Sequence, residues 1–286
     1  MKNQASKLDE LVSNAKNNKE VAKLIAIASG KGGVGKSTIS ANLSYVLWEM
    51  GYKVGVFDAD IGLANLDLIF GVKTNKTLLD VLKGNATFED IIINIESGLF
   101  LIPGHTGDEI FKYSATILEK INLQSVILDS IDYLIIDTGA GISESVQTFL
   151  HSSDELIVVT TPNPASLLDA YAIIKIAAKY KKKIYMIVNN VNSNKEANSV
   201  FNKILSVAKE NLGDLELFFL GRISRSDIVA QSNQQRKLFT KVLPKSPPSA
   251  NMQTIARSLV SQMEQNMLLS SESIFERLLR NVLNKF

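Results

Sequence analysis

The sequence contains no cysteine, only two histidines, and no apolar run of the length that crosses a membrane. The absence of cysteine excludes disulfides, thiolate metal sites, iron–sulfur clusters and cysteine nucleophiles. His105 and His151 lack a second histidine or cysteine at ligand spacing, so neither indicates a zinc site. No stretch approaches the ~20 apolar residues of a membrane-spanning helix, and the start of the chain lacks a secretory signal. We therefore expect a cytoplasmic protein.

A surplus of one charge sign is also missing, because 31 basic and 29 acidic residues leave a net charge of only +2. This balance does not by itself indicate nucleic-acid binding.

Apolar runs alternate with helical patterns, and the runs lie at 24–29, 53–57, 99–102, 133–136, 156–160, 184–188 and 215–220. Strands of this kind form a mainly parallel sheet. The sequence thus predicts an α/β fold with a doubly wound, mainly parallel sheet flanked by helices, and a proline-rich loop at 243–248.

A glycine-rich loop with the spacing of a phosphate-binding loop (P-loop) lies between a predicted strand and a predicted helix. It consists of Gly30, Lys31, Gly32, Gly33, Val34, Gly35, Lys36, Ser37 and Thr38. In such a loop the backbone N–H groups surround the phosphates, and the helix N-terminus adds partial positive charge. Lys36 would reach the β- and γ-phosphates, and the Ser37 hydroxyl would bind Mg²⁺. The strand, loop and helix together favour a nucleotide site over a plain glycine-rich turn.

Lys31 is a second lysine in this loop, although Lys36 alone suffices for the loop's own phosphates. If two copies of the chain met across their nucleotides, each Lys31 could neutralise phosphate charge on its partner. An arginine finger supplied in trans has that role. The alternative is a solvated lysine at a loop tip.

Aspartates follow two other predicted strands, at the sheet edge where ligands bind in open α/β folds. Asp60 is the candidate for orienting the attacking water or holding a water of the Mg²⁺ shell. Asp58 closes its strand and Asp67 lies beyond the turn, so both are weaker candidates. The alternative is that Asp58 and Asp60 only form the turn before Gly62.

Two further strand ends carry polar side chains. Asp137 follows a buried run, as the Mg²⁺-associated carboxylate does in P-loop enzymes. Gly139 and Gly141 provide backbone freedom for a loop that senses the γ-phosphate. Asn189 offers an amide donor and acceptor that can pair with a nucleobase edge, although asparagine at a strand end is also a common turn residue.

The Lys31-bearing loop, the stretch from Asp58 to Asp67 and the stretch from Asp137 to Gly141 resemble the MinD/ParA family of dimeric ATPases with a deviant Walker A motif. The resemblance covers roughly residues 23–263. It implies slow hydrolysis of ATP with Mg²⁺, and a nucleotide-sandwich homodimer in which Lys31 acts across the interface.

The resemblance also assigns roles to individual side chains. It implies four catalytic residues: Lys31, Lys36, Asp60 and Asp137. It implies that the metal is held by Ser37, Asp60 and Asp137. Beside the loop itself, Asn189 and Arg222 are implied to contact the nucleotide. Relatives often have proline where this chain has Ser224, which changes the second wall of the base pocket.

The segment 270–286 is predicted to be an amphipathic helix that begins with a Ser273–Glu276 capping box. One half of the helical wheel is apolar and holds Ile274, Phe275, Leu278, Leu279, Val282, Leu283 and Phe286. Such a helix suits the surface of an anionic membrane, and two copies in a dimer would bind more strongly than one. The alternative is a helix that packs on its own domain.

The segment 1–22 is predicted to be a short helix followed by a polar linker, which suits docking to a partner groove. A disordered tail is the alternative. Gln4, Ala5 and Leu8 resemble the segment with which MinD-like regulators of flagellar number stimulate FlhF, a flagellar signal-recognition-type GTPase. Asn3 and Asp9 depart from that pattern. The predicted organisation is a partner-binding segment at 1–22, an ATPase domain at 23–269 and a membrane-targeting helix at 270–286.

The resemblance implies a switch that controls flagellar number and placement. With ATP it would dimerise and join the inner face of the cell membrane. Flagellar ring proteins and a flagellar transcription activator are further candidate partners, and no specific nucleic acid is expected.

Two other ATPase functions are the alternatives, namely MinD-type division-site placement and ParA-type DNA partitioning. In the second, the basic run 179–183 would contact phosphates, although a solvated turn explains Lys181 to Lys183 more simply. Metal-cluster transfer, as in some relatives, is excluded because the chain has no cysteine.

Overall fold

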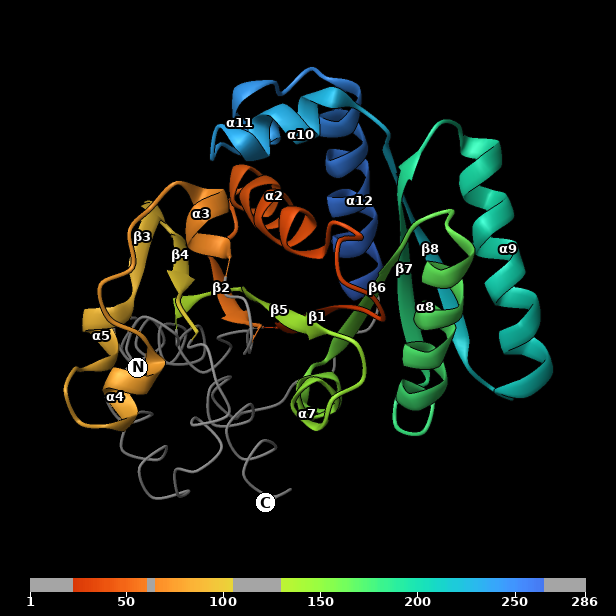
Figure 1. The fold of residues 1–286 in the computed structure, drawn as a ribbon, viewed down its shortest axis with the longest axis horizontal. Coiled ribbons are helices and arrows are strands. Elements are labelled where there is room, and N and C mark those ends of the chain that lie inside the picture. The colour runs from red at the N-terminus through yellow and green to blue at the C-terminus, as the bar shows by residue number, and fades with distance from the viewer. Residues whose placement is uncertain (1–22, 61–64, 105–129, 265–286) are drawn as a thin grey trace, which may run out of the picture.

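The computed structural model describes residues 23–60, 65–104 and 130–264. Within these residues the strands form one sheet in the order β3-β4-β2-β5-β1-β6-β7-β8 (Figure 1). The strands are β1 (Lys23–Ser29), β2 (Val54–Ala59), β3 (Ile93–Glu96), β4 (Leu99–Ile102), β5 (Tyr133–Ala140), β6 (Glu155–Thr160), β7 (Lys183–Val191) and β8 (Glu216–Ser224). All neighbouring pairs are parallel except β3 with β4. The predicted mainly parallel α/β fold is confirmed.

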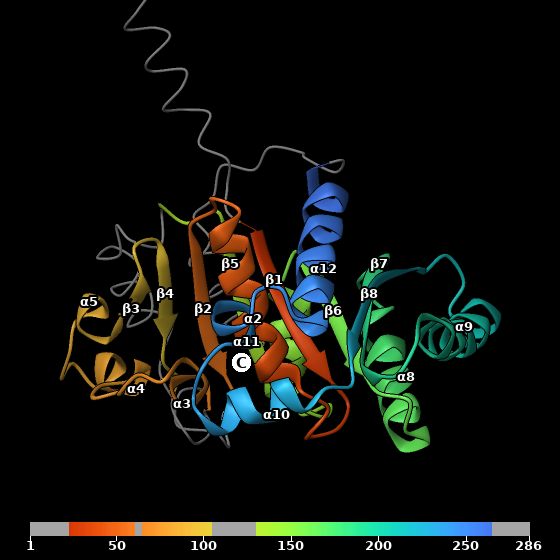
Figure 2. The same ribbon diagram turned by 90° about the horizontal axis from the view of Figure 1, so that it is seen from above.

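Helices cover both faces of this sheet (Figure 1, Figure 2). One face carries α2 (Lys36–Glu49), α3 (Leu66–Phe70), α10 (Asp227–Gln234), α11 (Phe239–Val242) and α12 (Pro247–Glu264). The other face carries α4 (Leu78–Leu82), α5 (Phe88–Ile91), α7 (Glu144–Ser152), α8 (Pro164–Ala177) and α9 (Asn194–Asn211). The inner strands are therefore shielded from water on both sides.

The central strand β1 shows why the strands appear in the sequence as continuous apolar runs. Its residues 24–28 are all fully buried. Ile25 and Ile27 pack beneath α2 and α12, whereas Ala26 and Ala28 face α7 and α8, because successive side chains of a strand point to opposite faces. The P-loop that follows β1 therefore starts from a strand held on both sides.

Several boundaries differ from the prediction. β5 and β8 run farther than expected because their pairing with β1 and β7 continues to Ala140 and Ser224. β3 was not predicted, since it is an antiparallel edge strand whose apolar pattern polar residues such as Asn94 interrupt. α12 begins at Pro247, inside the predicted loop, because the first turn of a helix tolerates proline.

Some predicted functional residues lie outside the described part of the chain. They are Gln4, Ala5, Leu8, Ile274, Phe275, Leu278, Leu279, Val282, Leu283 and Phe286. Gly62 and His105 also lie outside it. Among the described helices, none combines the length and the apolar character needed to span a bilayer.

Candidate nucleotide-binding site

The ends of β1, β2 and β5 meet at one edge of the sheet and bring three distant segments together. In the strand register, Asp137 of β5 lies beside Ile27 of β1 and beside Asp58 of β2. The P-loop leaves β1 at the same edge. Parallel strands end on the same side of a sheet, so the loop and both aspartate-bearing segments converge as predicted.

Glycines shape the backbone of the P-loop. Gly33 and Gly35 have φ angles of 80° and 91°, in the left-handed region that strains other residues. At Gly30 an added Cβ would lie 2.2 Å from the carbonyl oxygen of Asp169 in α8, whereas Gly32 has open space around it. Gly35 also precedes α2 without a side-chain cap, which leaves the first N–H groups of that helix available to a phosphate.

Lys36 and Asp137 form a buried ion pair behind the loop. Lys36 Nζ lies 3.0 Å from Asp137 Oδ1, and the two side chains are 6% and 1% exposed. The Ser40 hydroxyl donates to the same carboxylate oxygen at 2.8 Å. A cation and a hydroxyl therefore compensate the buried carboxylate. Sequence reasoning missed Ser40, although its position one helical turn after Lys36 puts both on one side of α2.

Asp58 is a buried carboxylate that organises the turn into α3. Its Oδ2 accepts the backbone N–H groups of Asn65 and Leu66, each at 3.0 Å, and its Oδ1 accepts that of Asp60 at 3.3 Å. Burial raises the pKa of Asp58 to about 7; the hydrogen bonds oppose this shift, and the nearby Asp137 adds to it. The Asp58 side chain therefore forms the turn, as the alternative interpretation of this residue predicted.

Asp60 is half-buried and lies near the glycines that follow Asp137. A Cβ added at Gly139 would be 3.5 Å from Asp60 Oδ1. Between these segments the Thr138 hydroxyl donates to the carbonyl oxygen of Ile27 at 3.0 Å, which ties β5 to β1. The structure thus brings Asp60, Asp137 and the P-loop together. Their roles toward water and metal stay predictions.

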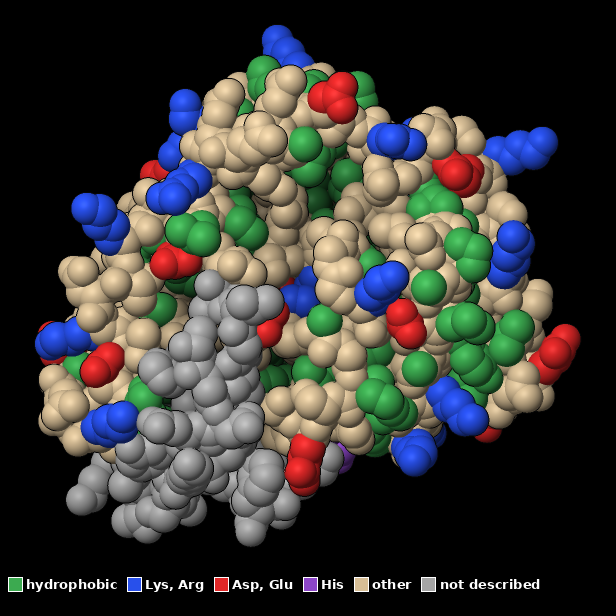
Figure 3. Space-filling view, in the orientation of Figure 1, with side chains coloured by type: hydrophobic (Ala, Val, Ile, Leu, Met, Phe, Trp, Pro, Cys, Tyr) green, Lys and Arg blue, Asp and Glu red, His purple; other side chains and the backbone are tan. Residues whose placement is uncertain are grey.

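Lys31 is exposed on the outer side of the loop. The first turns of α8 lie beside the loop, as the contact between Gly30 and Asp169 shows. Leu168 of α8 is 72% exposed, and Ile142 in the loop after β5 is 47% exposed. Figure 3 shows apolar side chains gathered over α8 and the adjoining part of α9. Exposed apolar side chains gathered in one region are typical of a protein interface.

Asn189 and Arg222 make hydrogen bonds within the chain. Asn189 Nδ2 donates to the carbonyl oxygen of Val34 in the P-loop at 2.7 Å, and its Oδ1 accepts the next residue's N–H at 2.8 Å. Arg222 donates to Asn194 and, at 2.8 Å, to the Ser224 hydroxyl. Base contact by either side chain stays a prediction, and for Asn189 it requires an exchange of partners.

Two lysines of the basic run between α8 and β7 make contacts within the fold. Lys183 Nζ lies 4.8 Å from the ring centroid of Tyr185 and 5.0 Å from that of Phe218. Lys181 donates to the carbonyl oxygen of Ser153. Within the predicted solvated turn Lys182 is exposed, whereas Lys181 and Lys183 are half-buried and also contact a backbone carbonyl and aromatic rings.

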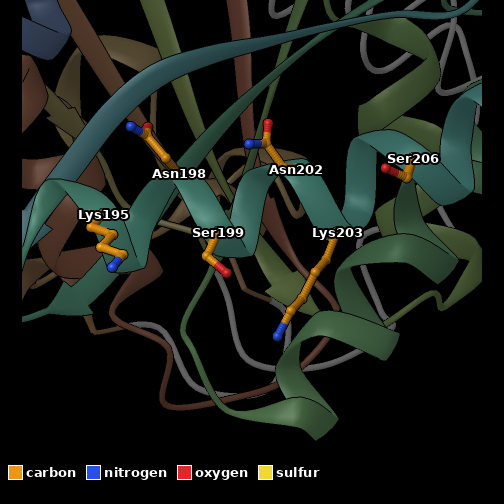
Figure 4. A pocket seen from close by; sticks show the side chains of 6 residues that line it. All are labelled: Lys195, Asn198, Ser199, Asn202, Lys203 and Ser206. Atoms are coloured by element: carbon orange, nitrogen blue, oxygen red, sulfur yellow. The ribbon is translucent and has the colours of Figure 1, made fainter.

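An open hollow of about 770 Å³ lies along α9, lined by Lys195, Asn198, Ser199, Asn202, Lys203 and Ser206 (Figure 4). Asn198 and Asn202 extend to one side of the helix, and Ser199 and Lys203 to the other. Small-molecule sites are concave and bring a few polar groups to one point. This hollow does not have that arrangement.

Metal binding by protein groups alone is not supported in the described residues. No group of three or more histidine, aspartate and glutamate side chains there could hold a metal ion. His151 instead packs against Tyr180, with ring centroids 5.0 Å apart. Mg²⁺ commonly binds through one or two carboxylates together with substrate phosphates, so the P-loop edge remains compatible with it.

Comparisons with known proteins agree with this geometry. Residues 20–260 match the ParA family, described as NUBPL iron-transfer P-loop NTPase. The chain is 48% identical to the flagellum site-determining protein YlxH of Helicobacter pylori, over 98% of this chain and 99% of that protein. It is 31% identical to the antiactivator FleN of Pseudomonas aeruginosa, over 83% of this chain and 86% of that protein. The septum site-determining protein MinD of Pyrococcus horikoshii, solved with Mg-ADP, has a TM-score of 0.69 and 26% identity, with 87% and 100% of the two chains covered.

Proposed function

The chain belongs to the MinD/ParA family of P-loop ATPases, and we propose that it is an ATP-dependent switch that controls flagellar number and placement. The observation that carries the switch mechanism is the buried Lys36–Asp137 pair behind a glycine loop that leaves Lys31 exposed. The flagellar role is supported by similarity to proteins named as a flagellum site-determining protein and an antiactivator. These are regulators of the FlhG (YlxH) type.

The residues at the P-loop edge fit ATP and Mg²⁺. The left-handed glycines and the uncapped start of α2 offer backbone N–H groups to phosphates. Lys36 would bind phosphate oxygens, and Ser37, Asp60 and Asp137 would hold the cation or its waters. Bound Mg²⁺ would neutralise phosphate charge. The ammonium of Lys36 is already paired with Asp137 and is therefore held in place before binding. Bound phosphates would compete with Asp137 for this ammonium group.

A homodimer with ATP at the interface would use Lys31. Its side chain is exposed, and the chain's own phosphate-binding lysine is a different, buried residue. The exposed Leu168 and Ile142 beside the loop would lose water contact in such a dimer. This supports the action of Lys31 on the partner's nucleotide over the solvated alternative.

The two ends of the chain would connect the switch to its surroundings. We propose that residues 270–286 bind the membrane when ATP is bound, and that residues 1–22 stimulate FlhF through Gln4, Ala5 and Leu8. The similarity to YlxH covers 98% of the chain and so extends beyond the ATPase domain, here taken as 23–269. The name of FleN, an antiactivator, favours a transcription activator among the candidate partners.

Two alternatives have less support. The matching family is described by iron transfer, but this chain has no cysteine thiolates to hold an iron–sulfur cluster. DNA partitioning would use the basic run before β7, of which Lys181 and Lys183 are engaged within the fold.

The proposal is tested by replacing Lys31 with glutamine in the full-length chain. We expect ATP-dependent dimerisation, measured by light scattering, and ATP turnover both to fall at least tenfold, because the partner's phosphates lose a cation. The thermal midpoint should not change, since Lys31 is exposed. Lys203→Gln, an exposed change on α9, is the matched control and should behave as wild type. Unchanged turnover and dimerisation in Lys31→Gln would contradict the proposal.

A further inference from the structure

Two asparagine side chains hold Thr38 in the first turn of α2. Asn42 Nδ2 donates to the carbonyl oxygen of Thr38 at 2.8 Å, and Asn233 Nδ2 donates to Thr38 Oγ1 at 2.9 Å. Asn42 is fully buried, and its Oδ1 accepts the N–H and the hydroxyl of Thr240 at 3.1 and 2.8 Å. Asn42 therefore fixes the backbone of Thr38 against α11, while Asn233 of α10 holds its side chain.

The Thr38 hydroxyl and the Asn233 side-chain oxygen each keep one hydrogen-bonding position without a partner among the described residues. Thr38 Oγ1 accepts from Asn233, but no described group accepts the proton of that hydroxyl. Asn233 Oδ1 is buried and has no partner among the described residues. A buried amide oxygen without a partner costs free energy, so packing alone does not explain its presence. Of these two groups the Thr38 hydroxyl is a donor, so beside a phosphate-binding loop it can donate its proton to an oxygen of a bound ligand.

We propose that Asn233 is a positioning residue for nucleotide binding. A hydroxyl carries one proton, and phosphate oxygens only accept hydrogen bonds. Because Asn233 donates to Thr38 Oγ1, the Thr38 proton is directed away from the amide and is free for a phosphate oxygen. Lys36 and Ser37 serve the terminal phosphates and the cation, so the Thr38 hydroxyl is left for the α-phosphate. This inference rests on the proposed nucleotide function and adds α10 to the site.

The role differs from that of a packing residue in a measurable way. If Asn233 acts by orienting the hydroxyl of Thr38, its effect on nucleotide affinity must disappear when that hydroxyl is absent. If it only supports the fold, its effect must persist. A double-mutant cycle with Asn233→Ala and Thr38→Val separates the two.

The experiment measures Mg-ADP binding to the full-length chain by titration calorimetry. Asn233→Ala should raise the dissociation constant about 3- to 10-fold in the wild-type background and less than twofold in the Thr38→Val background. Asn233→Asp should raise it further, because a carboxylate only accepts, takes the Thr38 proton and adds negative charge near the phosphates. Gln234→Ala, an exposed change on the same helix, is the control and should bind as wild type.

Thermal unfolding without nucleotide reports on the fold of each variant, and Asn233→Ala carries the test if Asn233→Asp does not fold. An unchanged dissociation constant for Asn233→Ala, or an equal loss in both backgrounds, would overturn the inference while leaving the proposed function intact. Failure of the wild-type chain to bind Mg-ADP would overturn both.

Discussion

Gly30 stands where the P-loop leaves β1, and the backbone of α8 occupies the space that a side chain would need. An added Cβ would lie 2.2 Å from the carbonyl oxygen of Asp169 and 2.3 Å from its carbonyl carbon. A backbone cannot move aside as a flexible side chain can. The first glycine of the loop is therefore required by packing against α8, in addition to any role in phosphate binding.

At this position we predict that Gly30→Ala lowers the free energy of unfolding by about 1–3 kcal/mol in nucleotide-free protein, because the methyl group forces α8 or the loop to shift. Urea denaturation measures the change. Gly32→Ala is the matched control, since nothing lies within 4 Å of its added Cβ. Equal stability of the two variants would show that α8 does not restrict the loop.

Asp58 makes stability depend on pH. Its pKa in the folded protein is about 7 and lies well above the ordinary value of 3.8. Between these values the folded chain keeps a proton that the unfolded chain releases. The stability that the folded chain gains by keeping this proton is therefore complete below about pH 4, and it is lost as the pH rises through about 7.

The test compares wild type with Asp58→Asn by urea denaturation without Mg²⁺ or nucleotide. From pH 5 to pH 8 the stability of Asp58→Asn relative to wild type should rise by on the order of 2 kcal/mol, because asparagine does not titrate. Using the difference between the two proteins removes the contribution of other buried carboxyls such as Glu155, whose pKa burial also raises. A difference that stays constant with pH would contradict this account.

At the scale of elements, the end of β8 is joined to the starts of α9 and α12. Asn251 Oδ1 accepts the hydroxyl and the N–H of Ser224 at 2.6 and 3.1 Å. Arg222 donates to the Ser224 hydroxyl and to Asn194. The family resemblance predicts proline at the position of Ser224, and proline has no N–H to donate. In this chain the departure supplies a polar connection between three elements.

We predict that Asn251→Ala lowers the free energy of unfolding by about 1–2 kcal/mol, because Ser224 loses the acceptor of two hydrogen bonds. Chemical denaturation measures it. Thr254→Ala, an exposed substitution on the same helix, should change stability by less than about 0.5 kcal/mol. If the two variants are equally stable, the connection at β8 contributes nothing.

In the whole molecule, both ends of the described core lie where the parallel strands begin, and the P-loop lies where β1 ends. β1 begins at Lys23 and runs toward the loop, whereas α12 begins beside Ser224 and runs back (Figure 2). The described chain therefore begins and ends far from the P-loop. In the proposed switch, ATP acts on membrane binding through the dimer, which carries two C-terminal helices and raises their effective concentration at the membrane.

The corresponding prediction concerns vesicles that contain anionic lipids. With ATP the full-length chain should sediment with them, and with ADP much less, whereas a chain that ends at Ser271 should stay in the supernatant with either nucleotide. Leu279→Ser should reduce sedimentation several-fold through lost apolar area, and Asn284→Ser, on the polar half of the helix, should not. Equal sedimentation of the truncated chain would exclude the C-terminal segment as the anchor.

Local patterns were enough to predict the layers of the fold. A strand buried on both faces, such as β1, must be apolar throughout, so its position is visible in a short window of sequence. The edge strand β3 was missed because one face of an edge strand has polar residues and its pairing is antiparallel. The start of α12 was misplaced because proline ends a helix in one context and begins it in another.

The phosphate-binding loop and the alternation of strands and helices could be predicted from the sequence, because each depends on residue types at short and regular spacing. The folded chain was needed to show that Lys36 pairs with Asp137, that Asp58 holds a turn, that Asn189 donates to the P-loop, and that Asn233 reaches Thr38 across a separation of 195 residues. Hydrogen-bond partners of this kind depend on which segments the sheet and its helices bring together, and no local pattern records that.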